Sequence, residues 1–308
     1  MKKILSLILV AVMLCSSVFA LGSCGLFGDS EPVVKVIDIA LTEEQYAFAV
    51  PKGDATMLAA INDFMADIEA DGTFDAILNK YFGDGTPTPV TSATEMKNDG
   101  SQLIVATNAA FAPFEYMEGE NYYGVDLEIM ALFAESLGKE LYIYNMDFDA
   151  VCLAVSSAGG SYVTEDENGN EITVTVSGGI ADIAAAGLTI NATRQQILDF
   201  SDSYYNASQM LIAAADDTTF DACETADDVL AILNSFDSSV NVCVQSGTTG
   251  QFFCEGDADW GFDGFAFTTT PLANGSLATQ NILNGTAKYV VIDEGPAKAI
   301  VEKINAAN

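Results

Sequence analysis

The 308-residue chain contains no histidine and only one arginine, Arg194. Eleven basic residues stand against 44 acidic ones, so the formal net charge is −33 at pH 7. This charge excludes binding to nucleic acid or anionic lipid through basic surface patches. The absence of histidine also removes a principal zinc ligand, and we expect no metal site and no cofactor.

Cysteine is scarce as well, with six residues in the chain. Two of them, Cys15 and Cys24, lie near the N-terminus. The others do not show the paired spacing of zinc ligands. They are Cys152, Cys223, Cys243 and Cys254. Cys243 and Cys254 could pair in an oxidising compartment, although we favour buried free thiols.

No apolar run is long enough to cross a membrane as a helix. The run at residues 4–14 follows Met1-Lys2-Lys3 and precedes Leu21-Gly22-Ser23-Cys24. This pattern predicts a signal peptide at residues 1–23. Leu-Gly-Ser-Cys also resembles a bacterial lipobox, which would make Cys24 the lipidation site and residues 24–33 a lipid-anchored tether. The alternative is ordinary secretion with Cys24 as a free thiol.

Hydrophobic residues make up 50% of the sequence, so the acidity is not that of a disordered acidic tail. The remaining chain is long enough for two lobes. We therefore expect an extracytoplasmic globular protein that contacts the cell membrane only through an N-terminal lipid anchor.

The single arginine follows a small, apolar segment. Residues 183–186 read Ile-Ala-Ala-Ala and predict a buried strand that ends at Gly187. Thr189 comes just past the strand end, where ligands bind in open α/β sheets. Arginine offers a planar fork of donors that captures carboxylates or phosphates in a bidentate manner, which lysine cannot do. The alternative for Arg194 is a surface ion pair with one of the many acidic residues.

These residues belong to a longer spaced motif. Ala186-Gly187-Leu188-Thr189-Ile190 precedes Arg194, and Asp199-Phe200-Ser201-Asp202 precedes Tyr204-Tyr205. The motif resembles the core motif of the polar amino-acid substrate-binding proteins of ABC importers. The resemblance implies an α/β fold, a two-lobed periplasmic-binding-protein-like (type II) clamp with a hinge. It also implies that Arg194 grips a ligand α-carboxylate and that an ABC transporter permease is the partner.

The order of the elements departs from that family. Strands are predicted at residues 34–39 and 46–50, followed by two helices that end before Gly83. Tyr46 to Asp54 and Ala70 to Gly83 resemble the C-terminal end of the family, although here they come first. Residues 102–116 resemble its opening strand and aromatic loop. The chain therefore looks circularly permuted, with a Pro/Thr linker at residues 84–99 joining the old termini.

This order predicts the domain boundaries. Lobe 1 would span residues 46–205, and lobe 2 would combine residues 34–45 with residues 206–308. Residues 160–178 contain Asn168-Gly169 between alternating runs, which predicts an inserted β-hairpin with a type I′ turn. We interpret the hairpin as surface decoration, with partner contact as the alternative. We expect a monomer, with a domain-swapped dimer as the rival.

The resemblance assigns a ligand-binding site for an amino-acid zwitterion. The carboxylate would meet Arg194 and the backbone around Thr189 and Thr249, while Asp293 would hold the ammonium group. A simpler role for Asp293 is to cap the following helix. The Gly/Thr turn at residues 246–250 enters a helix and would offer N–H groups to an anion, or it would only cap that helix. The full predicted set is Asn108, Phe111, Phe148, Ala186, Gly187, Thr189, Arg194, Gln245, Thr248, Thr249 and Asp293.

Three residues would contact the ligand side chain. Phe111 and Phe148 would sandwich it, and Gln245 would reach its polar atoms. Tyr205 would line the cleft or pack at the hinge. Asn108 replaces the acid that basic-amino-acid binders often carry, which disfavours lysine or arginine only slightly, so the sequence does not name the ligand.

Three functions compete on this fold. A transport receptor is favoured. An amino-acid-sensing domain would need a signalling or transmembrane segment after the lobes, and the sequence has none. A dehydratase-like enzyme could use acids such as Glu115, but we expect no catalysis, because no nucleophile–base pair is visible in the sequence.

Overall fold

A computed structural model describes residues 31–165 and 170–308. The predicted signal peptide, Cys24 and most of the tether lie outside the described residues, as does the Asn168-Gly169 turn. Within the described residues, no helix combines the length and apolar character that a membrane span requires.

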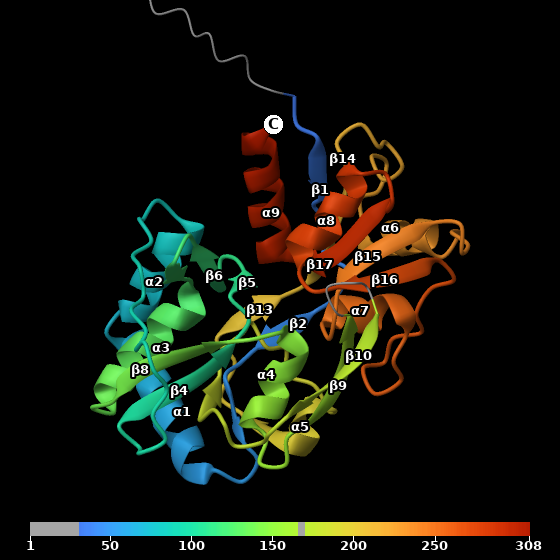
Figure 1. Ribbon diagram of the computed structural model, residues 1–308. Helices are drawn as coiled ribbons and strands as arrows, with labels where there is room; N and C mark the ends of the chain where they lie inside the picture. Colours follow the sequence, from blue (N-terminus) through green and yellow to red (C-terminus); the bar gives the residue numbers. More distant parts are fainter. Residues whose placement is uncertain (1–30, 166–169) are drawn as a thin grey trace, which may run out of the picture. The chain divides into compact units, whose positions relative to one another are not determined.

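One five-stranded sheet, with its helices, forms what we call lobe one (Figure 1). Its strand order is β12-β3-β11-β4-β8, with β4 parallel to β8 and β11, and β3 antiparallel to β11 and β12. Its strands are β3 (Ala49–Pro51), β4 (Gln102–Thr107), β8 (Glu140–Asn145), β11 (Ile183–Ala184) and β12 (Leu198–Phe200). All six residues of β4 are buried, as expected for a strand covered on both faces.

Helices cover both faces of this sheet. Successive side chains of β4 point to opposite sides and therefore pack against different helices. Leu103 and Val105 pack into the core with α1, α2 and α3, and Ile104 and Ala106 pack with α4. The helices are α1 (Ala55–Ala70), α2 (Thr73–Phe82), α3 (Val125–Ser136) and α4 (Phe148–Val155). The Asp54 side chain caps α1 by accepting a hydrogen bond from the Met57 N–H at 3.0 Å.

A second five-stranded sheet forms lobe two, with strand order β1-β14-β17-β15-β16. Its strands are β1 (Val34–Ile37), β14 (Gln209–Ala214), β15 (Asn241–Gln245), β16 (Thr268–Leu272) and β17 (Tyr289–Asp293). Two helices, α8 (Gly275–Leu283) and α9 (Glu294–Ala307), pack against one face. On the other face lie α6 (Ala226–Leu233) and α7 (Thr249–Glu255).

Two short strands carry the chain between the lobes. β2 (Glu44–Tyr46) pairs with β13 (Tyr205–Ala207), and Tyr205 lies opposite Tyr46. The continuous strand predicted at residues 46–50 is therefore wrong: Ala47 and Phe48 separate β2 from β3. Apolar runs specify burial but not the point at which a chain leaves one sheet for another. The Tyr205 ring packs against Tyr46, Phe82 and Phe114, so it belongs to the hinge.

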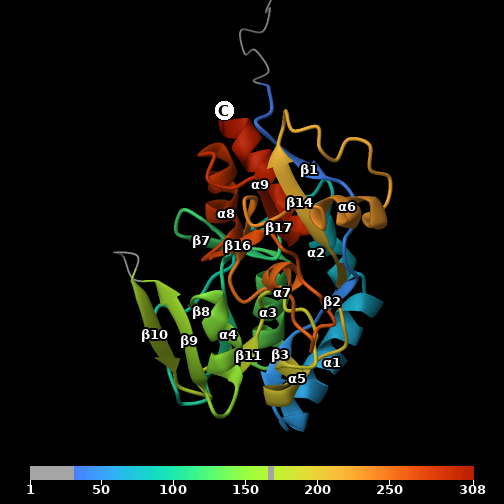
Figure 2. The same cartoon turned by 90° about the vertical axis from the view of Figure 1, so that its right-hand side faces the viewer.

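The smaller strands decorate lobe one. β5 (Ala110–Phe111), β6 (Glu115–Glu118) and β7 (Asn121–Tyr123) form a three-stranded sheet. β9 (Gly160–Glu165) and β10 (Glu171–Val176) form the antiparallel hairpin, which packs on α4 (Figure 2). Val163 and Ile172 of this hairpin are exposed.

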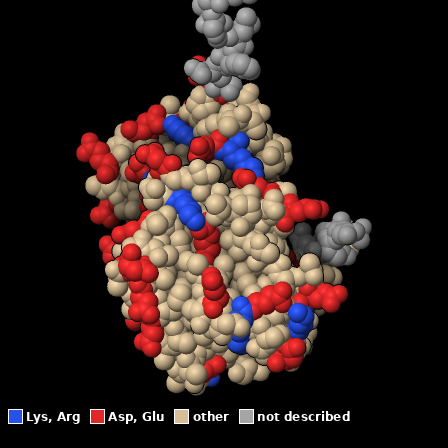
Figure 3. Space-filling model, turned by 90° about the vertical axis from the view of Figure 1, so that its left-hand side faces the viewer, with Lys and Arg blue, Asp and Glu red and all other residues tan. Residues whose placement is uncertain are grey.

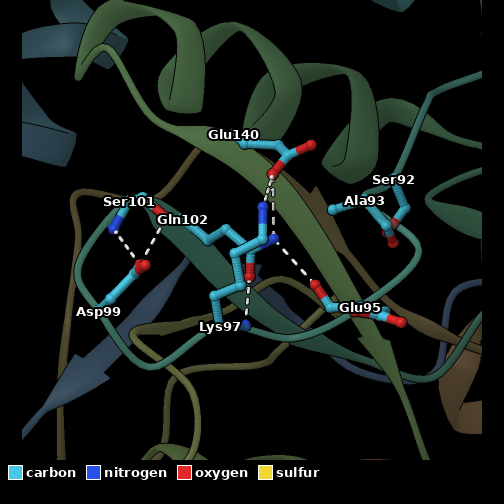
Figure 4. A network of polar contacts seen from close by, with 8 residues as sticks. All are labelled: Ser92, Ala93, Glu95, Lys97, Asp99, Ser101, Gln102 and Glu140. Atoms are coloured by element: carbon cyan, nitrogen blue, oxygen red, sulfur yellow. Dashed lines mark hydrogen bonds and ion pairs between the residues drawn. The ribbon is translucent and has the colours of Figure 1, made fainter.

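The segment predicted as a linker is attached to β7 and β8 by backbone hydrogen bonds. The Val90 N–H donates to the Tyr122 carbonyl and the Ala93 N–H to the Leu141 carbonyl, each at 2.8 Å. The end of the segment is held by the buried Gln102 side chain, which accepts from the Lys97 N–H and donates to the Glu95 carbonyl and the Glu140 carboxylate (Figure 4). The segment therefore lies against the protein along much of its length.

Candidate functional site

Arg194 begins the short helix α5 (Arg194–Ile197) and is only 8% exposed. Its Nη1 donates to the Thr189 carbonyl at 2.8 Å, and its backbone N–H donates to Asn191 Oδ1 at 2.7 Å. The turn after β11 therefore folds back on the guanidinium group and fixes its direction. The guanidinium group donates to carbonyl oxygens and forms no ion pair with the described residues. The surface ion pair considered as an alternative therefore does not form with them.

The same guanidinium group contacts lobe two. Its Nη2 donates to the Gly247 carbonyl at 3.2 Å. The central carbon Cζ lies 5.5 Å from the ring centroid of Phe148 and 5.5 Å from that of Trp260. Phe148 begins α4 in lobe one, whereas Trp260 lies in the loop between α7 and β16. Arg194 is thus enclosed by groups from both lobes.

A cluster of hydrogen-bonded polar side chains joins the hinge to both lobes. Glu44 in β2 accepts from the Thr189 hydroxyl at 2.7 Å and from Gln209 Nε2 at 2.9 Å. The Thr249 hydroxyl at the start of α7 donates to the Thr189 hydroxyl at 3.2 Å. A buried carboxylate is tolerated only with such partners. This cluster therefore places Thr189 and Thr249, two predicted site residues from opposite lobes, in direct contact.

Asp293 ends β17 and lies opposite Gln209 in the sheet. It is 4% exposed and accepts a hydrogen bond from the Tyr46 hydroxyl at 2.6 Å. Burial and then the nearby negative charge of Glu44 raise the pKa of Asp293 to about 7, against the opposing effect of the Tyr46 hydrogen bond. Asp293 occupies the N-cap position of α9 but makes no side-chain capping bond. The capping role is therefore wrong for its side chain.

A second pair of buried acids lies beneath the turn that contains Gly187. Asp126 accepts from the Gly187 N–H at 3.0 Å and from the Tyr204 hydroxyl at 2.6 Å. Burial raises the pKa of Asp126 to about 6. Burial and the Asp126 charge raise the pKa of Glu115 well above its ordinary value. Glu115 is fully buried, and neither of its carboxylate oxygens accepts a hydrogen bond from the described residues.

The remaining predicted residues take several positions around this centre. The Phe111 ring packs so closely on Gly187 that a Cβ there would lie 3.0 Å from it, and Gly187 has φ of +53°. Ala186 is buried in the lobe-one core. Asn108 accepts from Gln245 Nε2 at 3.4 Å, a long contact between the lobes. The sandwich formed by Phe111 and Phe148 stays a prediction, since Phe148 covers Arg194.

One N–H group of the predicted anion-binding turn already has a partner within the protein, and the anion-binding role of the turn stays a prediction. The Gly247 N–H donates to Gln251 Oε1 at 2.8 Å, and the Thr248 hydroxyl donates to the Gln245 carbonyl at 2.8 Å. α7 has only seven residues, so its dipole is small. The Gly247 carbonyl accepts a hydrogen bond from Arg194, and the Gly247 N–H is already satisfied by Gln251. The side chain of Gln251 could not be foreseen as the partner from the local pattern.

Three residues of this centre were missed from the sequence: Glu44, Gln209 and Trp260. Glu44 and Gln209 lie in strands where single polar residues are common, and nothing in their spacing marks them. Trp260 carried a signal that could have been used, because it is the only tryptophan in the chain. It lies in a loop rich in Gly, Asp and aromatic residues.

The cysteines and acidic residues do not form a metal centre among the described residues. Cys152, Cys223, Cys243 and Cys254 are free thiols, and the last two are buried. The interpretation of Cys243 and Cys254 as unpaired core residues is confirmed. Burial raises the pKa of both thiols, which keeps them protonated and unreactive at neutral pH.

The family of bacterial extracellular solute-binding proteins, family 3, matches residues 103–160 and 157–305. The chain belongs to this family. As a family 3 solute-binding protein it has the two-lobed type II fold, so the fold class predicted from the motif around Arg194 is confirmed. The family match leaves residues 31–102 uncovered, although those residues contribute strands to both sheets.

Individual relatives match parts of this family 3 protein. The arginine-binding extracellular protein ArtP of Bacillus subtilis is 30% identical over 130 residues, 41% of this chain and 43% of ArtP. A probable histidine-binding protein of Neisseria gonorrhoeae is 28% identical over 122 residues, 39% of this chain and 38% of the relative. The chain therefore aligns with less than half the length of either protein.

Solved structures are similar across more of the chain, and one of them is the amino acid ABC transporter substrate-binding protein AbpA of Streptococcus pneumoniae, bound to L-arginine. It is 26% identical, with a TM-score of 0.50, and the match covers 66% of this chain and 71% of AbpA.

Proposed function

We propose that this protein is an extracytoplasmic receptor that captures a polar amino acid and delivers it to the permease of an ABC importer. The observation that carries the proposal is the placement of Arg194 on lobe one and Asp293 on lobe two. Each is buried, and Thr189, Glu44 and Tyr46 connect them through hydrogen bonds and strand contacts. An amino-acid zwitterion carries one negative and one positive charge, so its binding site needs one cationic and one anionic group.

The proposed ligand contacts follow from the charges. Arg194 has five N–H donors at its planar edge, of which the described carbonyls of Thr189 and Gly247 engage two. The others are available for a carboxylate. Asp293, once ionised, accepts from the ligand ammonium. ArtP and AbpA support an amino acid as the ligand class, with arginine the first compound to test.

A thermal-shift screen of the twenty amino acids plus cystine tests this function. A ligand that binds only the folded state, at about 100 times its Kd, should stabilise the protein by about 2.7 kcal/mol. No shift with any compound, on protein shown by circular dichroism to be folded, would refute the proposal. We expect no turnover of any ligand, because the proposed contacts bind it without breaking a bond.

The acidic surface agrees with an extracytoplasmic receptor. Figure 3 shows Asp and Glu side chains distributed over one face, with few Lys or Arg side chains between them. Like charges of this kind keep a protein soluble and oppose non-specific association. We propose that the protein is a monomer that reaches the membrane only through its lipid anchor.

The proposed anchor gives a prediction for Cys24. The Cys24→Ser variant should move the protein from the membrane fraction to the soluble extracytoplasmic fraction, because the thioether-linked lipid can no longer form. Cell fractionation with immunoblotting measures this. The matched control is Cys15→Ser, within the predicted signal peptide, which should leave the location unchanged. Membrane retention of Cys24→Ser together with an unlipidated wild-type protein would contradict lipidation at this residue.

We also propose that the chain is a circular permutant of the family. Two observations support it: the family match begins at residue 103, and residues 34–82 contribute β1 to lobe two and β3, α1 and α2 to lobe one. The first described strand and the last helix are neighbours. Asn305 in α9 accepts from the Val33 N–H at 2.9 Å and donates to the Val34 carbonyl at 2.9 Å.

This proximity makes the permutation testable. A variant that begins at residue 100, with residues 306 and 33 joined by a short Gly/Ser loop and the chain opened in the 84–99 segment, should fold as a monomer. Its melting temperature and ligand affinity should stay close to those of the natural order, because every strand pairing is preserved. Thermal denaturation and size-exclusion chromatography measure this. An insoluble chain, or a dimer in either order, would contradict the monomeric permutant.

A further inference from the structure

The loop between α7 and β16 is shaped so that Trp260 projects from it. Asp257 and Phe262 exchange two backbone hydrogen bonds, at 2.9 and 3.0 Å, and the Trp260 N–H donates to the Asp257 carbonyl at 3.2 Å. Gly261, with φ of +75°, closes the turn. This turn places an aromatic ring at its tip, where the only tryptophan of the chain lies half-buried.

The Trp260 ring has two kinds of neighbour. Within lobe two it packs on Phe252, with centroids 5.1 Å apart, and on Phe262 at 6.3 Å. Across the lobes it covers the Arg194 guanidinium at 5.5 Å. Phe148 lies at the same distance from the same carbon, so one ring from each lobe encloses the charge.

Enclosure by rings suits an arginine that must bind a carboxylate. The N–H donors of guanidinium lie at the edge of its plane, and rings attract the cation without using those donors. Tryptophan gives the strongest such attraction among the side chains. The rings also remove water from the charge, which strengthens its hydrogen bonds. Trp260 is further placed to tie the lobes together, because its ring comes from lobe two and Arg194 from lobe one.

We propose that Trp260 is a positioning residue for ligand capture, which holds the Arg194 guanidinium in place from the opposite lobe. This inference rests on the proposed function for its effect on affinity, although the contact itself can be tested without a ligand. The competing view is that Trp260 only packs its own loop through Phe252 and Phe262.

Fluorescence of the single tryptophan tests the contact in the ligand-free protein. Arg194→Ala should shift the Trp260 emission and increase its quenching by acrylamide, because the ring loses the group that covers it. Lys52→Ala, which removes an exposed lysine of lobe one, is the matched control and should change neither. Equal emission and quenching in wild type and Arg194→Ala would overturn the proposal, whether or not any amino acid binds.

Affinity tests the role in capture, with L-arginine as the first probe and otherwise the amino acid that the thermal-shift screen identifies. Trp260→Leu should weaken binding by about 2- to 30-fold, mainly through faster release, and Trp260→Phe should restore part of that loss. Phe262→Leu, in the same loop, is the control for loop packing and should have little effect. If Trp260→Leu binds as wild type does, or if Phe262→Leu weakens binding equally, Trp260 does not position Arg194. If the wild type binds no amino acid, the proposed function fails, and the fluorescence result alone decides the contact.

Discussion

Arg194→Ala should weaken binding of the amino acid by about 30- to 4,000-fold. Loss of one partner from a desolvated charge pair costs about 2–5 kcal/mol, and each 1.4 kcal/mol corresponds to about tenfold in Kd. The bulk of the effect arises because the ligand carboxylate would be buried without a counter-charge. Isothermal titration calorimetry measures Kd, and circular dichroism checks that the variant is folded.

Two further variants distinguish the effect of the planar donor set of Arg194 from that of positive charge alone. Arg194→Lys keeps a positive charge but loses the planar set of donors, so it should still bind clearly less tightly than wild type. Lys52→Ala removes an exposed lysine of lobe one that pairs with Asp199, and it should leave the affinity unchanged. Binding by Arg194→Ala within about threefold of wild type, a difference below about 1 kcal/mol, would contradict the assignment.

Asp293→Asn should have opposite effects on stability and on binding. At about pH 8 the ligand-free variant should unfold at higher urea concentration than wild type, since the buried carboxylate and its repulsion with Glu44 are gone. The amide oxygen can still accept from the Tyr46 hydroxyl. Binding should fall by about 30- to 4,000-fold, because the ligand ammonium then loses its anionic partner.

The sign of the pH dependence follows from the raised pKa. The pKa of Asp293 is about 7 in the folded protein, and its ordinary value is 3.8. Between these values the folded state binds more protons than the unfolded state, so this contribution to stability is lost as pH rises from about 4 to about 7. The stabilisation by Asp293→Asn should therefore be greatest above about pH 7 and vanish near about pH 4. The raised pKa values of Asp126 and Glu115 act in the same direction in both proteins.

Ligand binding should show the reverse trend for the wild type. Because the ammonium needs an ionised Asp293, a proton must leave when ligand binds below about pH 7, and affinity should fall by up to about tenfold per pH unit there. Calorimetry in buffers of different ionisation enthalpy measures that proton release. Asp38→Asn, at an exposed residue of lobe two, serves as the control and should change neither stability profile nor affinity. Affinity that is independent of pH from about 5 to about 8 would contradict an ammonium contact with Asp293.

The sequence was sufficient to predict the position of residues and helices that a spaced motif or a local pattern defines. Arg194 and Thr189 follow a buried strand at fixed distances, and Asp293 ends another, so their placement at strand ends was predictable. Helix α1 followed from the spacing of Ile61, Met65 and Ile68, which are buried as expected. These features depend on neighbours in the chain.

What could not be predicted depends on contacts between distant segments. Glu44 is one acid among 44, and only the crossing of β2 beside Thr189 and Gln209 gives it a role. Trp260 approaches Arg194 from the other lobe, a distance of 66 residues along the chain that no local pattern encodes.

The central claim is that a zwitterion bridges Arg194 on lobe one and Asp293 on lobe two. The most direct test is calorimetry of the wild-type protein with three compounds: the amino acid identified by the screen, its decarboxylated amine and its des-amino acid. A ligand favours the closed arrangement only by its difference in affinity for the two states, so an analogue with one charged group should lose most of that preference. We predict strong binding of the amino acid alone, with both analogues at least about 30-fold weaker. Binding of either analogue within about threefold of the amino acid would contradict the account.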